Sequence, residues 1–239
     1  MDSATLILIA AVVFAGAFVQ GLSVLGFPFV ASPVVTQIIP GTGAVGLVNA
    51  LSIVQNLWLI IRTRGPIAWP VLARMAPGLL VGIGIGWAIV AFVDPRVFPV
   101  IVAVSAMASI IWLLTAHRFR GAGASIVSTV WGGAVNTVAG VGGPPIASYL
   151  VTRGLAFSGY VRTLQFTFAV IDIVSLPILG VAAPSLGALA IWLLAMLIGS
   201  LLGEALRQRL PQQRAQAIGK AVILVVCVVA LIRSILVIA

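Results

Sequence analysis

The sequence predicts an all-α polytopic membrane protein, in which ten hydrophobic helical segments form two inverted five-segment repeats. Its 239 residues are 62% hydrophobic and only 7% charged, with a mean hydropathy of +1.27. A soluble domain carries about 25% charged residues, so a soluble chain of this composition could not keep its surface hydrated. No ionisable side chain occurs between Asp2 and Arg62, a stretch far longer than the roughly 20 residues of one spanning helix. These observations argue against a cytosolic enzyme, a secreted disulfide scaffold and a disordered chain.

Ten apolar segments remain when the chain is divided at charges, prolines and glycines. Most of them are long enough to span a bilayer, but the second and seventh are short and begin in a Gly/Pro cluster. Short, interrupted segments at matching places in two halves are the best sequence indication of a transporter's binding site. The segments run over 4–20, 26–39, 43–61, 70–93, 97–116, 122–139, 143–153, 160–180, 186–206 and 215–238.

The two halves of the chain resemble each other when they are offset by 116 residues. QGLSVLGFPFVAS, residues 20–32, then lies over NTVAGVGGPPIAS, residues 136–148. Several such matches in one order indicate an internal duplication rather than chance similarity between apolar helices. Three pairs of polar residues coincide at this offset: Gln20 with Asn136, Asn49 with Gln165, and Asn56 with Asp172.

The distribution of basic residues predicts the topology. The connections after the second, fourth and eighth segments carry only Arg96, next to Asp94, whereas four other connections are rich in basic residues. The positive-inside rule places the four basic connections in the cytoplasm and the other three outside. Segments one and two must then form one hairpin, and segments six and seven another, each bent at its Gly-rich centre. The residues of the four cytoplasmic connections are Arg62, Arg64, Arg74; His117, Arg118, Arg120; Arg153, Arg162; and Arg207, Arg209, Arg214, Lys220.

Three full crossings remain in each half, and this odd number inverts the second half relative to the first. We therefore expect an N-terminal transmembrane repeat over residues 1–120 and an inverted C-terminal repeat over 121–239, which together make one transport unit. Both termini should lie outside, and the protein should be a multi-pass component of the cell's inner (plasma) membrane.

The net charge of +9 would suggest nucleic acid as the partner of a soluble chain. Here the basic residues lie in short loops, so we expect the partners to be the lipid bilayer and a small anionic substrate, with no nucleic acid. His117 stands without the several His, Cys or carboxylate neighbours that a metal site needs. No Walker-type phosphate loop and no Ser–His set for hydrolysis are found. The sequence thus predicts no cofactor, no metal and no enzymatic activity.

The Gly- and Pro-rich hairpin centres, residues 20–28 and 136–145, are the predicted binding site. Glycine lets the backbone turn, and proline fits the first turn of a new helix. Two helices restarting there would direct N–H groups and positive dipole ends toward an anion; the alternative is that these are packing kinks. We expect Gly142 to need a positive φ. The predicted substrate-binding residues are Gln20, Ser23, Gly26, Asn49, Asn136, Thr137, Gly140, Gly142, Gly143 and Gln165.

Asp172 is the only acidic residue deep in a predicted span. A charge in the membrane is costly and usually functional, so one hypothesis is that Asp172 couples protons to transport or gates it. The other is a structural carboxyl group, held by hydrogen bonds or by a neighbouring arginine. Because a carboxylate repels an anion, we expect a gate near the substrate rather than direct contact. Arg153 and Arg162, which flank the second hairpin, either only set the topology or attract the anion from the cytoplasm.

Small residues recur at helical spacing in the fourth and ninth segments. Gly78, Gly82 and Gly86 form one series, and Gly199 and Gly203 form the other. This spacing is typical of helices whose backbones approach closely. We expect both series to serve packing inside the bundle.

These features resemble the sulfite exporter TauE/SafE family, also called the TSUP family. Its members typically have two related apolar halves, each opening with a Gly-rich, Pro-containing stretch like GLSVLGFPFVASP and GAVNTVAGVGGPPIASYL. The first stretch departs from that pattern, with Ser23 and Phe27 where glycine is common. The resemblance covers nearly the whole chain. It implies transport, usually outward, of sulfur-containing anions such as sulfite, sulfoacetate, taurine or isethionate.

We therefore expect a secondary transporter that alternates access around an anion site at the membrane midplane. The family resemblance implies that it is an exporter. Two alternatives stay open. One is an anion channel, or an exporter of another small anion, on the same scaffold. The other is a membrane protein that assists enzyme assembly and transports nothing.

Overall fold

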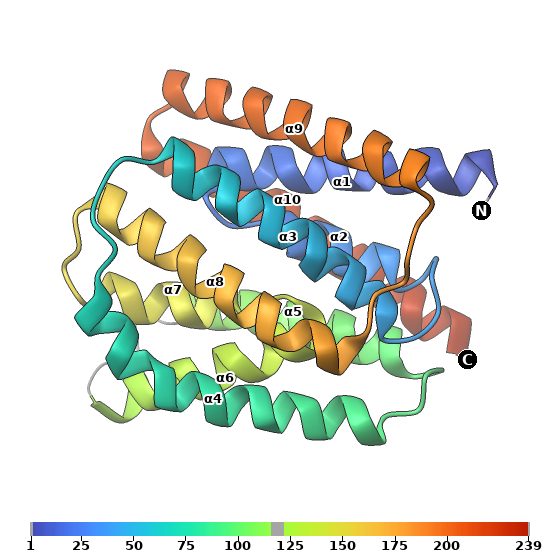
Figure 1. The fold of residues 1–239 in the computed structure, drawn as a ribbon, viewed down its shortest axis with the longest axis horizontal. Coiled ribbons are helices and arrows are strands. Elements are labelled where there is room, and N and C mark those ends of the chain that lie inside the picture. Colours follow the sequence, from blue (N-terminus) through green and yellow to red (C-terminus); the bar gives the residue numbers. More distant parts are fainter. Residues whose placement is uncertain (1, 116–121, 239) are drawn as a thin grey trace.

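The computed structural model describes residues 2–115 and 122–238, and within these ranges it contains ten α-helices and no strand (Figure 1). The ten helices coincide with the ten predicted apolar segments, so the all-helical prediction is confirmed. They are α1 (Ser3–Ser23), α2 (Phe27–Val35), α3 (Gly43–Arg62), α4 (Trp69–Phe92), α5 (Phe98–Thr115), α6 (Ala122–Ala139), α7 (Gly143–Val151), α8 (Phe157–Leu179), α9 (Leu186–Arg209) and α10 (Gln212–Ile238).

Six of these helices are long and apolar enough to cross a bilayer: α1, α3, α4, α8, α9 and α10. The apolar parts of α5 and α6 are shorter, Phe98–Trp112 and Ile126–Ala139. By contrast, α2 and α7 have nine residues each. At about 1.5 Å per residue they reach less than half of the roughly 30 Å hydrocarbon core. The chain is thus a multi-pass membrane protein with two half-length helices.

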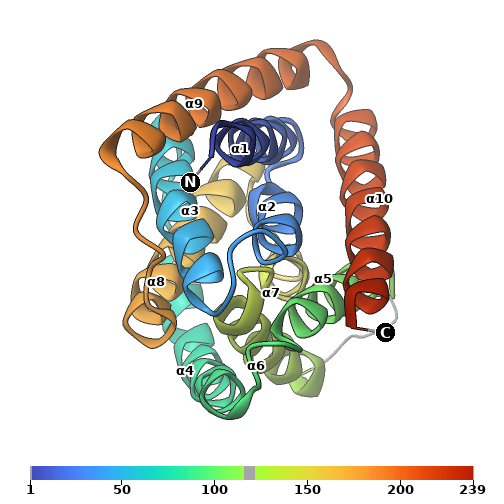
Figure 2. The same cartoon turned by 90° about the vertical axis from the view of Figure 1, so that its right-hand side faces the viewer.

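Figure 2 looks along the bundle and shows α2 and α7 in its interior, with α4, α9 and α10 at its periphery. Phe27 and Phe29 of α2 and Ile146 and Leu150 of α7 are almost fully buried. The peripheral helices instead expose large apolar side chains, such as Phe92 of α4. This distribution suits a protein whose outer surface faces lipid and whose short helices are covered by protein.

The glycine series hold two long helix pairs together. α9 packs along α1, and α4 packs along α6. A Cβ atom on Gly199 or Gly203 would collide with the backbone of α1, and one on Gly82 or Gly86 would collide with the backbone of α6. The prediction that both series serve close helix packing is confirmed. The third major pair is α3 with α8.

Both predicted hairpins are bent at their Gly-rich centres. The chain breaks between α1 and α2 at residues 24–26, where Val24 has a φ of 73° and Gly26 a φ of 150°. It breaks again between α6 and α7, where Gly140 has a φ of 73°. Val24 and Gly140 are 116 residues apart, so the left-handed residue stands at the same place in each half. At Val24 the Cβ atom makes this conformation strained, which is a feature that clusters at functional sites.

The expectation of a positive φ at Gly142 is wrong. Gly142 has a φ of −68°, which any residue can adopt. The turn is made two residues earlier, at Gly140. Gly142 is instead required by space, because a Cβ atom there would collide with the Gly132 carbonyl of α6 and lie 2.7 Å from Cβ of Asn136.

The connections that sequence analysis assigned to the two sides of the membrane lie at opposite ends of the bundle. In Figure 1 the α3–α4, α7–α8 and α9–α10 connections lie at the left end. The α2–α3, α4–α5 and α8–α9 connections lie at the right end, with the start of α1 and the end of α10. The remaining basic connection, with His117, Arg118 and Arg120, lies outside the described residues.

The positive-inside rule predicts that the left end of Figure 1 is cytoplasmic. A single cysteine introduced at position 64, 120 or 209 should react with an impermeant thiol reagent only after the membrane is opened, whereas one at position 94 should react in sealed cells. Cys227 is buried, so the parent chain should give little background. Labelling of position 64 from the outside would contradict the inverted topology.

Candidate functional site

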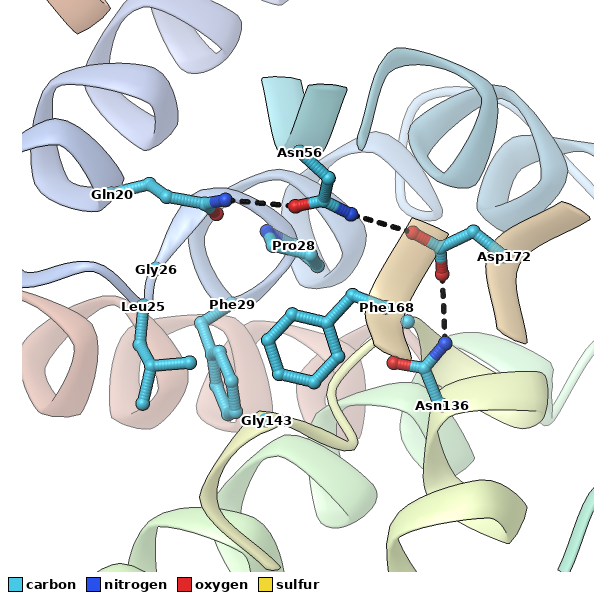
Figure 3. Close-up of a pocket in the computed structure, with 11 residues that line it drawn as sticks. Gln20, Leu25, Gly26, Pro28, Phe29, Asn56, Asn136, Gly143, Phe168 and Asp172 are labelled. Carbon is cyan, nitrogen blue, oxygen red and sulfur yellow. Dashed lines mark hydrogen bonds between the residues drawn. The ribbon is translucent and has the colours of Figure 1, made fainter. Parts of the chain in front are cut away.

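A narrow pocket lies where the two hairpin breaks meet α3 and α8 (Figure 3). Both breaks contribute, because Gly26 is the N-cap of α2 and Gly143 is the first residue of α7. Two phenylalanine rings, from Phe29 of α2 and Phe168 of α8, stand against the pocket. The complete lining is Gln20, Leu25, Gly26, Pro28, Phe29, Asn56, Asn136, Gly140, Gly143, Phe168 and Asp172.

A chain of buried hydrogen bonds crosses one wall of the pocket (Figure 3). Gln20 Nε2 donates to Asn56 Oδ1 at 3.1 Å, and Asn56 Nδ2 donates to Asp172 Oδ2 at 3.2 Å. From the other side, Asn136 Nδ2 donates to Asp172 Oδ1 at 2.7 Å. These four side chains come from α1, α3, α8 and α6, so the chain connects both hairpins through the two central helices.

The side-chain oxygens of Gln20 and Asn136 cap the two restarted helices. Gln20 Oε1 accepts a hydrogen bond from the Phe27 N–H at 3.0 Å, and Asn136 Oδ1 accepts one from the Gly142 N–H at 3.2 Å. Proline at 28, 144 and 145 has no N–H to offer. Fewer N–H groups thus remain for a ligand than the sequence suggested, although the positive ends of both helix dipoles still border the pocket.

Asp172 is held by two amides and lines the pocket itself. Its side chain is buried, and each carboxylate oxygen accepts one amide N–H. The ion pair with an arginine that sequence analysis considered is not found, because the one salt bridge among the described residues joins Arg62 to Glu204. Among the described residues, hydrogen bonds and not an ion pair therefore hold this carboxyl group.

Six of the predicted site residues line the pocket: Gln20, Gly26, Asn136, Gly140, Gly143 and Asp172. Three other predicted residues, which are not in the lining, form hydrogen bonds with the backbone or with side chains of neighbouring helices. The Ser23 hydroxyl donates within its own hairpin to carbonyls of Val19 and Leu25. Thr137 contacts the Gly133 carbonyl and Ser175 Oγ, and Gln165 Nε2 donates to the Val24 carbonyl at 2.8 Å.

Four predicted residues remain, and none of them is part of the pocket lining. Gly142 lies in the turn between α6 and α7, and Asn49 lies next to Gly140 of the same turn. Arg153 stacks over the Tyr149 ring at 4.2 Å, and Arg162 donates to the Gly65 carbonyl. Both arginines therefore lie near the connections that are predicted to be cytoplasmic.

Sequence reasoning missed the apolar part of the pocket: Leu25, Pro28, Phe29 and Phe168. Nothing in the sequence separates these residues from the many other apolar residues of a membrane protein. Asn56 also lines the pocket, and it is not among the predicted site residues. Its signal was present, because it matches Asp172 at the repeat offset.

A model of the family described as "Sulfite exporter TauE/SafE" matches residues 8–232, which is nearly the whole chain. The chain belongs to the TauE/SafE family. The family assignment makes this protein a membrane transporter of the sulfite-exporter type, and the resemblance inferred from the hairpin motifs is confirmed. No curated protein and no solved structure matched the chain.

Proposed function

We propose that this TauE/SafE protein is a secondary transporter that exports a small sulfur-containing anion, such as sulfite or a C2 organosulfonate, across the inner membrane. The observation that carries the proposal is the pocket between the two hairpin breaks, lined by Gln20, Asn56, Asn136 and Asp172. Half-length helices that restart around a polar pocket inside a bundle are typical of secondary transporters.

We further propose that the two halves are inverted repeats which rock against each other around this pocket. Two sets of matching contacts support this view. The Gln20–Asn56 and Asn136–Asp172 hydrogen bonds correspond at an offset of 116 residues. Likewise, α1 packs on α9 as α6 packs on α4, each through a glycine series.

An anion in this pocket would be repelled by the negative charge of an ionised Asp172. Its described lining contains one carboxylate, Asp172, and no Lys, Arg or His. Neutral amides and two helix N-termini must therefore bind the anion. A proton on Asp172 would remove the repulsion, which supports a coupling role for this residue. Arg153 and Arg162 would raise the anion's concentration at the cytoplasmic mouth.

Export of an anion is already downhill in an inside-negative potential, by roughly 2.3 kcal/mol per charge per 100 mV. Proton coupling is thus an addition to, and not a requirement of, the proposed transport. The experiment is export of labelled sulfite or isethionate from vesicles containing the purified protein. Transport of neither, together with no thermal stabilisation by either anion, would overturn the proposal and favour the assembly-factor alternative.

Asp172→Asn should fold, because the amide is nearly isosteric with the carboxyl and Asn56 already occupies the matching place. If Asp172 must carry a proton when the anion binds, anion binding to the parent should weaken as the pH rises from about 5 to about 8. The variant mimics the protonated form, so its binding should be strong and independent of pH. Isothermal titration over this pH range measures the anion affinity of the parent and of the variant. If the parent binds the anion equally well at every pH, Asp172 does not carry a coupling proton and its role is structural.

A further inference from the structure

Asn49 of α3 has a buried amide group without a partner among the described residues. Its side chain is fully buried, yet neither Nδ2 nor Oδ1 makes a hydrogen bond to any residue that the structure describes. The same holds for the hydroxyl oxygen of Ser32 in α2. A buried polar group that makes no hydrogen bond is destabilising, and such groups are rare in folded proteins.

The corresponding amide in the other half is satisfied. Gln165, which matches Asn49 at the repeat offset, accepts from Gln20 at 3.2 Å and donates to the Val24 carbonyl at 2.8 Å. Val24 is the left-handed residue of the first break, and its counterpart in the second break is Gly140. Asn49 is one methylene shorter than glutamine and makes no such bond. The first break is thus hydrogen-bonded to α8 through Gln165, whereas Asn49 of α3 makes no corresponding hydrogen bond to the second break among the described residues.

Asn49 and Ser32 both face the second break. A Cβ atom on Gly140 would lie 2.7 Å from Asn49 Oδ1 and 3.3 Å from both Ser32 Oγ and Pro28 Cβ. Gly140 and Pro28 line the pocket. The two unpaired side chains are not part of the lining. They lie directly behind it, next to Gly140, a lining residue that has no side chain of its own.

We infer that Asn49 and Ser32 form a subsite that hydrogen-bonds a hydroxyl-like group of the transported anion. An amide has both N–H donors and a carbonyl acceptor, so a group with acceptors alone would leave Oδ1 unpaired. A hydroxyl can donate to Oδ1 and accept from Nδ2 or from Ser32. The subsite thus makes the pocket selective for anions that carry a hydrogen-bond donor as well as the charged group. This inference rests on the proposed anion transport.

Two probes that differ by a single hydroxyl test the inference: isethionate (2-hydroxyethanesulfonate) and ethanesulfonate. Their affinities for the purified protein are measured by isothermal titration. The parent should bind isethionate about tenfold more tightly, as one additional hydrogen bond is worth about that factor. Asn49→Leu, which has similar volume and no polar atoms, should bind both probes equally. It should also raise the melting temperature of the ligand-free protein, since an unpaired buried amide has been removed.

Ser32→Ala and Ser52→Ala complete the test. Ser32→Ala should reduce the preference for isethionate, and it serves as a second variant should Asn49→Leu not fold. Ser52, one turn from Asn49, is also buried, and its hydroxyl has no hydrogen-bond partner within the described ranges. Ser52→Ala is therefore a matched control that should keep the preference.

The outcomes separate the subsite from the function. Equal affinity of the parent for both probes would overturn the subsite and leave sulfonate transport standing, with ordered water as the partner of Asn49. A Ser52→Ala variant that loses the preference as fully as Asn49→Leu would also overturn it, because the effect would then be general packing. Binding of neither probe would overturn the proposed sulfonate substrate and the subsite with it.

Discussion

Replacing Gly142 with valine is expected to weaken isethionate binding by roughly ten- to a hundredfold. The new side chain has no room, because its Cβ would collide with the Gly132 carbonyl and lie 2.7 Å from Cβ of Asn136. Overpacking of this kind costs about 1–3 kcal/mol. Because the anion is expected to bind the parental shape of the turn, that cost is subtracted from the binding free energy, and about 1.4 kcal/mol corresponds to a factor of ten in affinity. The turn must move away from α6. That movement breaks the 3.2 Å hydrogen bond from the Gly142 N–H to Asn136 and displaces the pocket lining next to it.

Isothermal titration measures the affinity, and export from vesicles measures the transport. Gly84→Val is the matched control, because a Cβ atom on Gly84 meets no atom of the described residues within 4 Å and the residue is exposed on α4. It should bind and transport like the parent. If Gly142→Val also binds like the parent, the turn between α6 and α7 does not shape the site.

Asn136→Ala is expected to weaken sulfonate binding by one to two orders of magnitude. The side chain performs two tasks at once, since its nitrogen holds Asp172 at 2.7 Å and its oxygen caps α7 at the Gly142 N–H. A neutral hydrogen bond contributes about 0.5–1.5 kcal/mol and one to a charged group about 1.5–3 kcal/mol. At about 1.4 kcal/mol per decade, loss of the contact to the Asp172 carboxylate accounts for the expected range, and loss of the neutral cap on α7 contributes at most about one decade.

Gln208→Ala is the control for Asn136→Ala, because Gln208 is an exposed amide on α9 outside the pocket. It should leave the affinity unchanged. The melting temperature of both variants should be measured without ligand, so that a general loss of stability is recognised. Parental affinity in a folded Asn136→Ala protein would show that the paired hairpin breaks do not form the binding site.

The positions of all ten helices could be predicted from the sequence because the bilayer imposes a strong rule. Every spanning segment must be apolar and must satisfy its backbone internally, so charges and Gly/Pro clusters mark the ends of helices. The predicted segment 122–139 coincides with α6, Ala122–Ala139. The half-length of α2 and α7 was visible in the same way, as a short apolar run between a Gly/Pro cluster and a polar connection.

Part of the site was predictable for a related reason. A polar side chain in the middle of an apolar helix is conspicuous, and Gln20, Asn136 and Asp172 stand out in their segments. Their role as a connected chain was not predictable. Gln20 and Asn56 are 36 residues apart in the sequence, and Asn56 and Asp172 are 116 apart. Their contact depends on how the hairpins pack against α3 and α8.

The sequence by itself determined the membrane location, the ten helices, the two broken hairpins and the small set of buried polar residues, because each follows from local hydrophobicity and local backbone chemistry. Only the tertiary structure decided which of those residues meet and which partner each one has. It turned Gln20 and Asn136 into helix caps, placed the left-handed turn at Gly140 instead of Gly142, and brought Phe29 and Phe168 to the pocket. It also left Asn49 unpaired while satisfying Gln165, because one methylene decides whether an amide reaches a carbonyl on the facing hairpin.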